Sequence, residues 1–165
     1  LVACDSNGGG PPPSDLEGTY IFEEFVFVTE GSAIDNFNIL QDTLVTDTAN
    51  VSSPRLEFFG ADATVDLIYV LDRQNGPFRS RTPGQFSTGS GRVTIDFSEA
   101  SEEKRFELLL PQVVQLERQQ EDGDRLVADI KLKDVDIDNY SPGRYGGIDE
   151  VDGTLRMELE RVQAQ

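Results

Sequence analysis

The chain has no histidine, no tryptophan, one cysteine and one methionine among its 165 residues. Without histidine, Ser-His-Asp and Cys-His catalytic arrangements and histidine-ligated zinc sites are excluded. A single cysteine cannot form an internal disulfide, so packing has to hold the fold together. No stretch approaches the roughly 18 consecutive apolar residues that a transmembrane helix needs. A domain of about 150 residues can still bury a core of ordinary size without covalent staples.

Basic residues are also scarce, because 14 Lys and Arg stand against 31 Asp and Glu and leave a net charge of −17. This balance argues against a nucleic-acid partner, since such binding depends on a basic surface. Lys104, Lys131 and Lys133 are the only lysines. Acid excess with few lysines resembles halophilic proteins, in which salt screens the repulsion between like charges. A merely soluble acidic surface explains the composition equally well.

Apolar residues that alternate with polar ones dominate the chain and predict an all-β fold. Turn sequences such as Asn75-Gly76, Asp122-Gly123 and Gly89-Ser90-Gly91 punctuate these rows and predict tight hairpins. Short helical pieces are expected only around residues 98–105 and 31–36. The clearest rows are Val65-Leu67-Tyr69-Leu71, Val93-Ile95-Phe97, Phe106-Leu108-Leu110, Leu126-Ala128-Ile130-Leu132 and Leu155-Met157-Leu159.

Two of the expected strands change phase midway, which favours a barrel. Inward positions shift parity around Glu23-Glu24 and again around Lys133-Asp134. A β-bulge at each point would keep both halves facing inward and bend the strand. An antiparallel up-and-down meander of about eight to ten strands must protect its edges. Bent strands favour closure into a barrel, with a β-sandwich as the alternative.

The start of the chain resembles the lipobox of bacterial lipoproteins. Leu1-Val2-Ala3 stand directly before Cys4, and a polar stretch rich in glycine and proline follows. The resemblance implies that a signal peptide has been removed and that acylated Cys4 anchors the protein in a membrane. It places the protein in the bacterial cell envelope, facing the periplasm or the cell surface. Residues 1–15 are then a flexible tether, and residues 16–165 are the β-barrel domain.

Further residues extend this resemblance to the lipocalin-like lipoproteins of bacteria. Gly18-Thr19-Tyr20 opens the first long strand, with Tyr20 in place of the tryptophan of the lipocalin Gly-x-Trp signature, and the meander ends with Gly153-Thr154-Leu155. The resemblance implies a barrel around a central cavity for a small apolar ligand. The expected cavity wall consists of the inward-facing residues Tyr20, Phe22, Tyr69, Val93, Phe97, Leu108 and Met157.

The glycine-rich loop of residues 141–147 is expected to cover one end of the barrel, where Arg144 and Tyr145 would meet a ligand or partner. The same aromatic and aliphatic side chains also suit a barrel that is filled by its own residues. The leading hypothesis is therefore a lipid-anchored, non-enzymatic protein that binds or carries a small apolar molecule. The alternative is a filled barrel that acts as a structural or protein-interaction module at the membrane surface.

Three further patterns involve charged side chains. Asp134, Asp136 and Asp138 have the spacing of calcium-loop ligands, although Asn139 and Tyr145 depart from the EF-hand pattern. Calcium is the one cofactor considered, and a solvated acidic strand end is the alternative. Paired carboxylates, such as those of Glu23 and Glu24, leave an envelope hydrolase as a third hypothesis. The Ser-x-x-Lys match at residues 101–104 lacks its companion motifs and is interpreted as chance.

Overall fold

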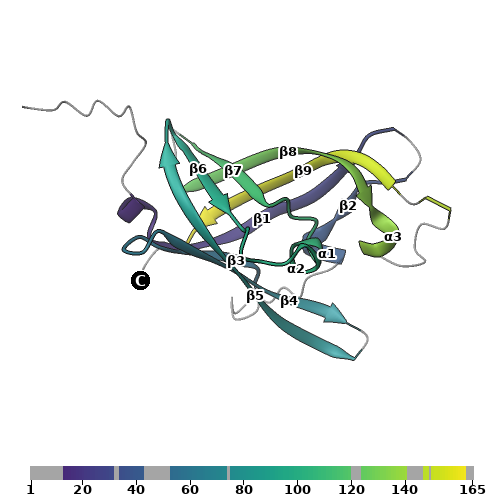
Figure 1. The fold of residues 1–165 in the computed structure, drawn as a ribbon, viewed down its shortest axis with the longest axis horizontal. Coiled ribbons are helices and arrows are strands. Elements are labelled where there is room, and N and C mark those ends of the chain that lie inside the picture. The colour runs from purple at the N-terminus through teal and green to yellow at the C-terminus, as the bar shows by residue number, and fades with distance from the viewer. Residues whose placement is uncertain are drawn as a thin grey trace, which may run out of the picture.

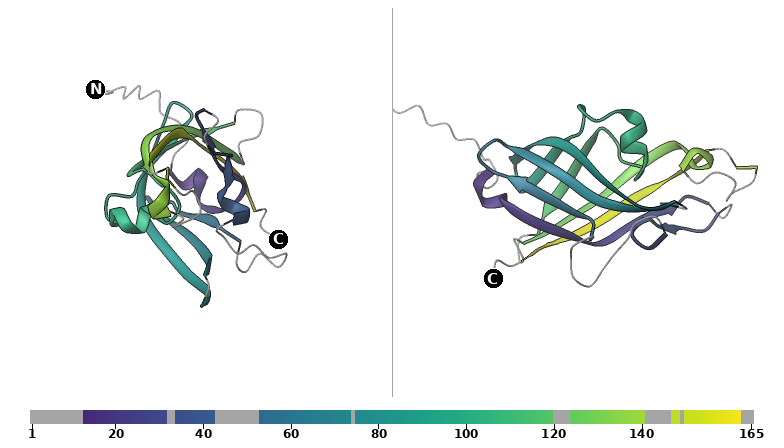
Figure 2. Two further views of the ribbon diagram at one scale, coloured as in Figure 1. Left: turned by 90° about the vertical axis from the view of Figure 1, so that its right-hand side faces the viewer. Right: turned by 90° about the horizontal axis from the view of Figure 1, so that it is seen from below.

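The structure, a computed structural model, describes residues 13–31, 34–42, 53–73, 75–119, 124–140, 147–148 and 150–162. Eight antiparallel strands close into a barrel, each pairing with the next and the last pairing with the first (Figures 1 and 2). The predicted meander and barrel are confirmed, and the sandwich alternative is wrong. The strands are β1 (Gly18–Thr29), β3 (Arg55–Phe59), β4 (Thr64–Arg73), β5 (Gly76–Gly89), β6 (Arg92–Asp96), β7 (Val113–Arg118), β8 (Arg125–Asp136) and β9 (Glu150–Arg161).

Short elements complete the described chain. Strand β2 (Phe37–Asn38) pairs with β1 on the same edge as β3, further along the strand, because β9 occupies the other edge. The helical pieces are η1 (Pro13–Leu16), α1 (Ile39–Asp42), α2 (Glu102–Phe106) and α3 (Ile137–Tyr140). Helix α2 confirms the helix expected near residues 98–105. The helix expected over residues 31–36 is not found in the described part of that segment, and α1 follows it instead. No helix among the described residues is long and apolar enough to cross a membrane.

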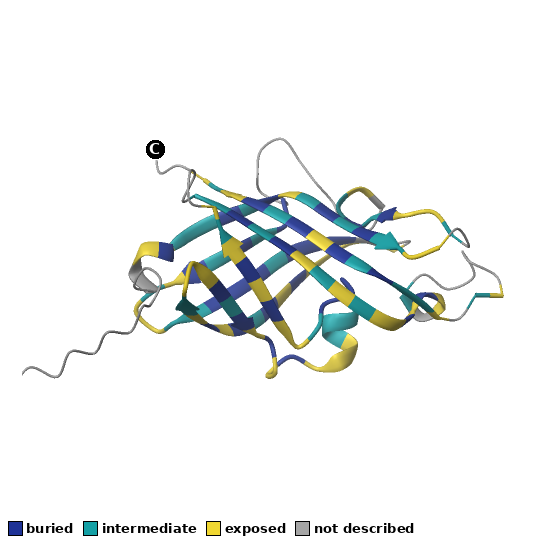
Figure 3. Ribbon diagram, turned by 90° about the horizontal axis from the view of Figure 1, so that it is seen from above, coloured by how far each residue is buried: buried dark blue, intermediate teal, exposed yellow. Residues whose placement is uncertain are grey.

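Both predicted bulges are present. The pairing of β1 with β9 shifts between Phe22 and Glu24, and the pairing of β8 with β9 shifts between Leu132 and Val135. Asp134 takes up the second shift with a φ of 52°, and its N–H donates to Asp152 Oδ1 at 2.9 Å. Buried residues therefore continue to alternate with exposed ones along the strands on either side of each bend (Figure 3).

The strand predicted over Phe106, Leu108 and Leu110 is wrong. Phe106 ends α2, and residues 107–110 form a turn in which Leu109 has a φ of 57°. Ser101 caps α2 by accepting a hydrogen bond from the Lys104 N–H at 3.1 Å, so the Ser-x-x-Lys match is a helix start. Because Leu109 is apolar as well, the alternation here is broken, and all three leucines are buried in the turn. We call α2 together with residues 107–112 the α2 strap.

Strands β4 and β5 extend beyond the barrel wall. Strand β3 pairs with β4 only as far as Ile68, and β6 pairs with β5 only from Gln85 onward. Residues 69–73 and 76–80 therefore pair only with each other and form a hairpin that projects from the barrel (Figure 1). We call this hairpin the β4–β5 arm.

Aromatic packing fills the barrel between its ends. Tyr20 and Phe58 meet edge to face with ring centroids 5.3 Å apart, and Phe27 and Phe37 lie 5.1 Å apart. Gly153 on β9 makes room for the Phe27 ring, because a Cβ at this position would lie 2.5 Å from Phe27 Cζ and 2.5 Å from the Val28 carbonyl oxygen. A side chain cannot fit there unless the backbone moves.

Candidate functional site: a packed interior and an open seam

The expected cavity wall is part of the core. All seven residues are at most 5% exposed and belong to one hydrophobic cluster: Tyr20, Phe22, Tyr69, Val93, Phe97, Leu108 and Met157. Their burial is confirmed, although Leu108 lies in the α2 strap instead of a strand and Tyr69 lies on the β4–β5 arm, where its hydroxyl contacts that strap. Their role in binding a ligand stays a prediction.

The space beside three of these side chains, Phe22, Phe97 and Met157, is very small. An apolar void inside the barrel measures about 10 Å³ and is lined by Phe22, Leu56, Leu67, Ile95, Phe97, Leu110, Val114, Leu116 and Met157. This volume is close to the minimum that holds one water molecule. Pockets for small organic ligands measure roughly 300–1,000 Å³. This void is therefore too small to hold such a ligand.

Arg161, at the end of β9, closes one end of the barrel. Its Nη2 donates to the carbonyl oxygens of Asp15 at 2.8 Å and Glu17 at 2.6 Å, and its Nη1 lies 3.2 Å from Asp124 Oδ1. The guanidinium carbon stands 5.4 Å from the centroid of the Tyr20 ring. Burial raises the pKa of Tyr20, and the charge of Arg161 partly opposes that rise. The Tyr20 hydroxyl is buried and has no hydrogen-bond partner among the described residues.

A polar cluster joins the α2 strap to the β4–β5 arm. The Tyr69 hydroxyl donates to Glu107 Oε2 at 2.7 Å and lies 3.4 Å from Thr82 Oγ1. Lys104 Nζ lies 3.5 Å from Glu107 Oε2 and also contacts Ser80 Oγ. Burial raises the pKa of Tyr69 to about 12, and Glu107 adds to the rise, whereas Ser80 and Thr82 oppose it.

This cluster is a docking contact and not an open reaction site. Ser80 is only 6% exposed, so its hydroxyl is not accessible to a substrate. The ammonium of Lys104 is engaged by Glu107. Sequence reasoning identified Tyr69 but missed its partners. Two of these partners, Ser80 and Thr82, could have been found from the sequence. They occupy the same alternating positions of β5 as buried Phe86, so they face the same side as Phe86.

A groove lies on the outer surface, where β7 and β8 separate. Each strand is fully paired on its other side, β7 with β6 and β8 with β9. Between them only two pairs form, Glu117 with Val127 and Arg118 with Leu126. Beyond these pairs lies a groove of about 540 Å³, which we call the seam groove. It is lined by Arg92, Val113, Gln115, Glu117, Val127, Ala128, Asp129, Ile130 and Lys131.

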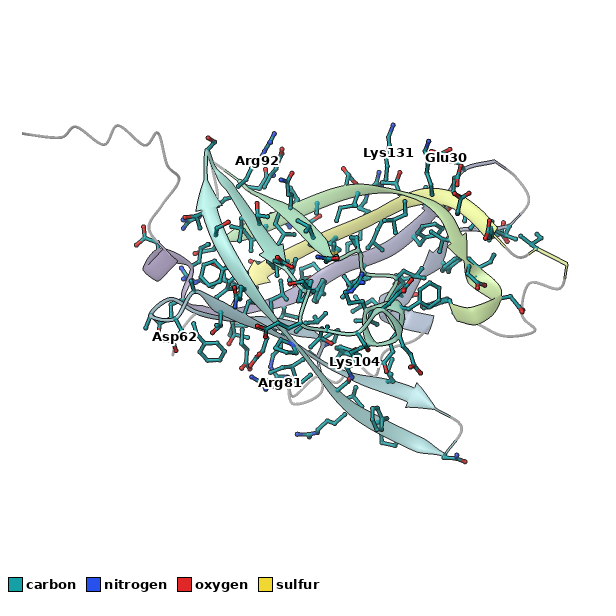
Figure 4. The ribbon with its side chains drawn as sticks, in the orientation of Figure 1. Glu30, Asp62, Arg81, Arg92, Lys104 and Lys131 are labelled. Atoms are coloured by element: carbon teal, nitrogen blue, oxygen red, sulfur yellow. The ribbon has the colours of Figure 1, made fainter. Side chains whose placement is uncertain are left out.

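The seam groove is nearly neutral in a strongly acidic protein. Arg92 Nη2 lies 3.6 Å from Glu117 Oε1, and Asp129 Oδ1 lies 3.0 Å from Arg156 Nε. Lys131 has no ion pair among the described residues, and it projects from the same side of the barrel as Arg92 (Figure 4). Apolar surface is available beside these charges, since Val113 is 46% exposed.

Outside the groove, Arg156 links three neighbouring strands. Its Nε lies 3.0 Å from Asp129 Oδ1 on β8 and 4.0 Å from Glu24 Oε1 on β1. The hydrogen bond to Asp129 raises the pKa of Arg156, and the charges of both carboxylates add to the rise. Of the carboxylates considered for hydrolysis, Glu24 is thus an ion-pair partner, and Glu23 is exposed beside it.

Several predicted residues are not brought together. Cys4, Arg144 and Tyr145 lie outside the described residues. Asp134 sits on the β8 bulge, Asp136 ends β8, and Asp138 lies in α3. In the part of the chain that the structure describes, no three carboxylate or thiol side chains are placed to hold a metal ion. Calcium binding therefore rests on the sequence spacing alone.

No protein-family model, no curated protein and no solved structure matches this chain. The class is therefore defined by the architecture itself, a closed eight-stranded antiparallel barrel with one added strand. A small apolar void lies among its described interior side chains, and the seam groove lies on the outside.

Proposed function

We propose that this protein is a lipid-anchored module of the bacterial cell envelope that binds another protein on the outer surface of a filled barrel. One comparison carries the proposal: the void inside the barrel measures about 10 Å³, whereas the seam groove measures about 540 Å³. A small-molecule carrier needs enclosed space for its cargo, and a protein-binding module needs accessible surface.

The envelope location is supported by the resemblance of the first residues to a lipobox. If acylated Cys4 is the anchor, eight residues separate it from η1, which begins at Pro13. A fully extended chain covers at most about 3.3–3.6 Å per residue, so the barrel would stay within about 30 Å of the membrane. The net charge of −17 would keep it off anionic lipid headgroups. The partner would then be another envelope protein near the membrane surface.

The second candidate remains the carrier of a small apolar ligand. The resemblance to lipocalin-like proteins supports it, and so does the Tyr20 hydroxyl, a buried polar group without a hydrogen-bond partner among the described residues. A ligand with one hydrogen-bond acceptor would satisfy that hydroxyl. Loop residues Arg144 and Tyr145 would then contribute to its binding, as the sequence predicts.

Native mass spectrometry of the protein purified from its own host separates the two candidates. We expect the mass of acyl chains on Cys4, their loss in Cys4→Ser, and no retained small molecule. A small apolar molecule that stays bound to the folded protein, in both the wild type and Cys4→Ser, would overturn the protein-binding proposal in favour of the carrier. An unmodified Cys4 would overturn the envelope anchor.

A further inference from the structure

The backbone of β7 shows which of its residues face the seam groove. The Phe97 N–H donates to the Gln112 carbonyl at 2.8 Å, and the Arg118 N–H donates to the Gly91 carbonyl at 2.9 Å. Hydrogen-bonded pairs recur at every second residue of an antiparallel ladder. Even-numbered residues of β7 therefore bond to β6. The backbone groups of Val113, Gln115 and Glu117 point the other way, toward β8.

Strand β8 presents the matching set of backbone N–H and C=O groups toward β7. The Gln119 N–H donates to the Arg125 carbonyl at 3.1 Å, so odd-numbered residues of β8 face β7. The ladder continues through Glu117 and Val127 and then ends. Further along, Gln115 stands opposite Asp129, and Val113 stands opposite Lys131, across the groove. None of these four residues belongs to the β7–β8 ladder, which pairs only Glu117 with Val127 and Arg118 with Leu126.

We propose that the seam groove binds an extended peptide segment of a partner protein as an additional strand between β7 and β8. The inference rests on the proposed function and names the chemistry of its partner. The two rims of the seam groove are β7 and β8. An extended backbone points N–H and C=O groups to the same side at every second residue, and this spacing matches the groups that each rim points into the groove. A segment of about four residues, about 13 Å long, matches the open length and runs antiparallel to one rim and parallel to the other.

Side chains around the groove indicate the composition of this segment. Val113, Val127 and Ile130 offer apolar contacts to alternate residues of an added strand. Lys131, the groove cation without a described ion pair, favours one acidic residue at the open end. A second copy of this chain is a poor occupant, because two bodies of net charge −17 repel each other.

The β4–β5 arm also has unpaired edges, but they are less suited to this role. Each edge of the arm faces away from the other, so an added strand would bond on one side only. The seam groove presents two edges in register, and a peptide there bonds to both. In β-strand addition, hydrogen bonds to the peptide backbone supply the affinity, and contacts with alternate side chains of the peptide supply the specificity.

The test pans a phage-displayed library of random heptapeptides against the full chain carrying Cys4→Ser. We expect enriched sequences to alternate apolar and polar residues and to include one acidic residue. Gln115→Pro removes one N–H that faces the groove and leaves the β6 ladder intact, and proline is tolerated at such edge positions. It should weaken the selected peptides about tenfold or more, whereas the matched Gln115→Ala, which keeps the N–H, should stay within about twofold.

Charge and backbone controls sharpen the result. Lys131→Glu should weaken binding of the acidic peptides and be rescued by peptides in which lysine replaces the acid. If Gln115→Pro lowers the melting temperature too far for a binding assay, the same test uses the wild-type protein with peptides N-methylated at alternate residues. Methylation in either register should weaken binding, because the N–H groups of each register face one of the two rims, and a loss in one register alone would show pairing to a single edge and overturn the inference.

The other outcomes overturn either the inference or the proposed function, and they can be told apart. Selected peptides that bind Gln115→Pro as well as Gln115→Ala would place the binding surface elsewhere, which leaves the proposed function standing. A library that yields no alternating sequence excludes strand addition. A dimer seen by sedimentation, and lost in Gln115→Pro, would make a second copy the occupant. Conversely, a retained apolar ligand together with Gln115-dependent peptides would refute the proposed function and not the seam groove.

Discussion

Replacing Arg161 by methionine should cost this protein a large share of its stability. Methionine keeps the apolar part of the side chain and removes the guanidinium, which donates to the carbonyl oxygens of Asp15 and Glu17 and pairs with Asp124. Each bond to an accessible carbonyl contributes about 1 kcal/mol. The half-exposed pair and the contact with the Tyr20 ring contribute up to about 1 kcal/mol each. We expect a loss of about 3 kcal/mol.

Urea unfolding of Arg161→Met measures this loss, and the matched control is Arg156→Met. Arg156 also contacts two carboxylates, but its side chain is 52% exposed, so its replacement should change the unfolding midpoint little. In a domain of about 150 residues, a loss of about 3 kcal/mol lowers Tm by about 6–12 °C. Amide exchange should also accelerate at Leu16, which η1 buries. Equal midpoints for the two variants would refute the role assigned to Arg161.

Further predictions concern packing, buried hydroxyls and charge. Gly153→Ala should destabilise the barrel by about 3 kcal/mol, since the added Cβ would meet the Phe27 ring and the β1 backbone. The control is Gly89→Ala, whose added Cβ points into open space, and thermal melts should show that it is tolerated. Tyr69→Phe should lower the free energy of unfolding by about 1–2 kcal/mol, because it removes the hydrogen bond to Glu107. Tyr20→Phe should be neutral or stabilising in the same urea assay, since the Tyr20 hydroxyl has no partner among the described residues. The pKa of Tyr69 is raised to about 12, above the value near 10 of an unfolded tyrosine, so its contribution is complete below pH 10 and lost between about pH 10 and 12. Tyr69→Phe should flatten this alkaline loss in urea midpoints measured against pH. A net charge of −17 predicts a higher Tm in 1 M NaCl, where the screening length is about 3 Å, than in dilute buffer, and an unchanged Tm would remove the halophilic interpretation.

The parts of the fold that depend on local parity could be predicted from the sequence. Alternation predicted the strands, and the two parity changes located both bulges at the residues where the register shifts. Closure into a barrel followed, because bent strands joined by tight turns have few other ways to protect their edges. The burial of the inward residues is a direct consequence of the same periodicity.

The parts that depend on long-range pairing could not be predicted. The run Leu108-Leu109-Leu110 fits a strand or a buried turn equally well. In the structure the N–H groups of Leu108 and Leu110 donate to the Arg105 carbonyl and form the turn. The neighbouring Glu107 joins this turn to the β4–β5 arm through Tyr69. Nothing in the sequence of β7 or β8 shows that their ladder stops after Glu117 and Val127, since both strands have ordinary alternation. The volume left inside the barrel depends on the fit of all inward side chains together, which no single row reveals.

The seam opens where two well-braced halves of the barrel meet. Before β7, Glu107 of the α2 strap is bonded to the arm through Tyr69, and the Phe97 N–H donates to Gln112, so β7 is held toward β6. Strand β8 is held toward β9 by its ladder, and Arg156 ties it onward to β1. Each half keeps its own hydrogen bonds, and none would break if a strand entered between them. A peptide of the kind proposed would therefore gain bonds on both rims while the ladders on the other sides of β7 and β8 stay intact.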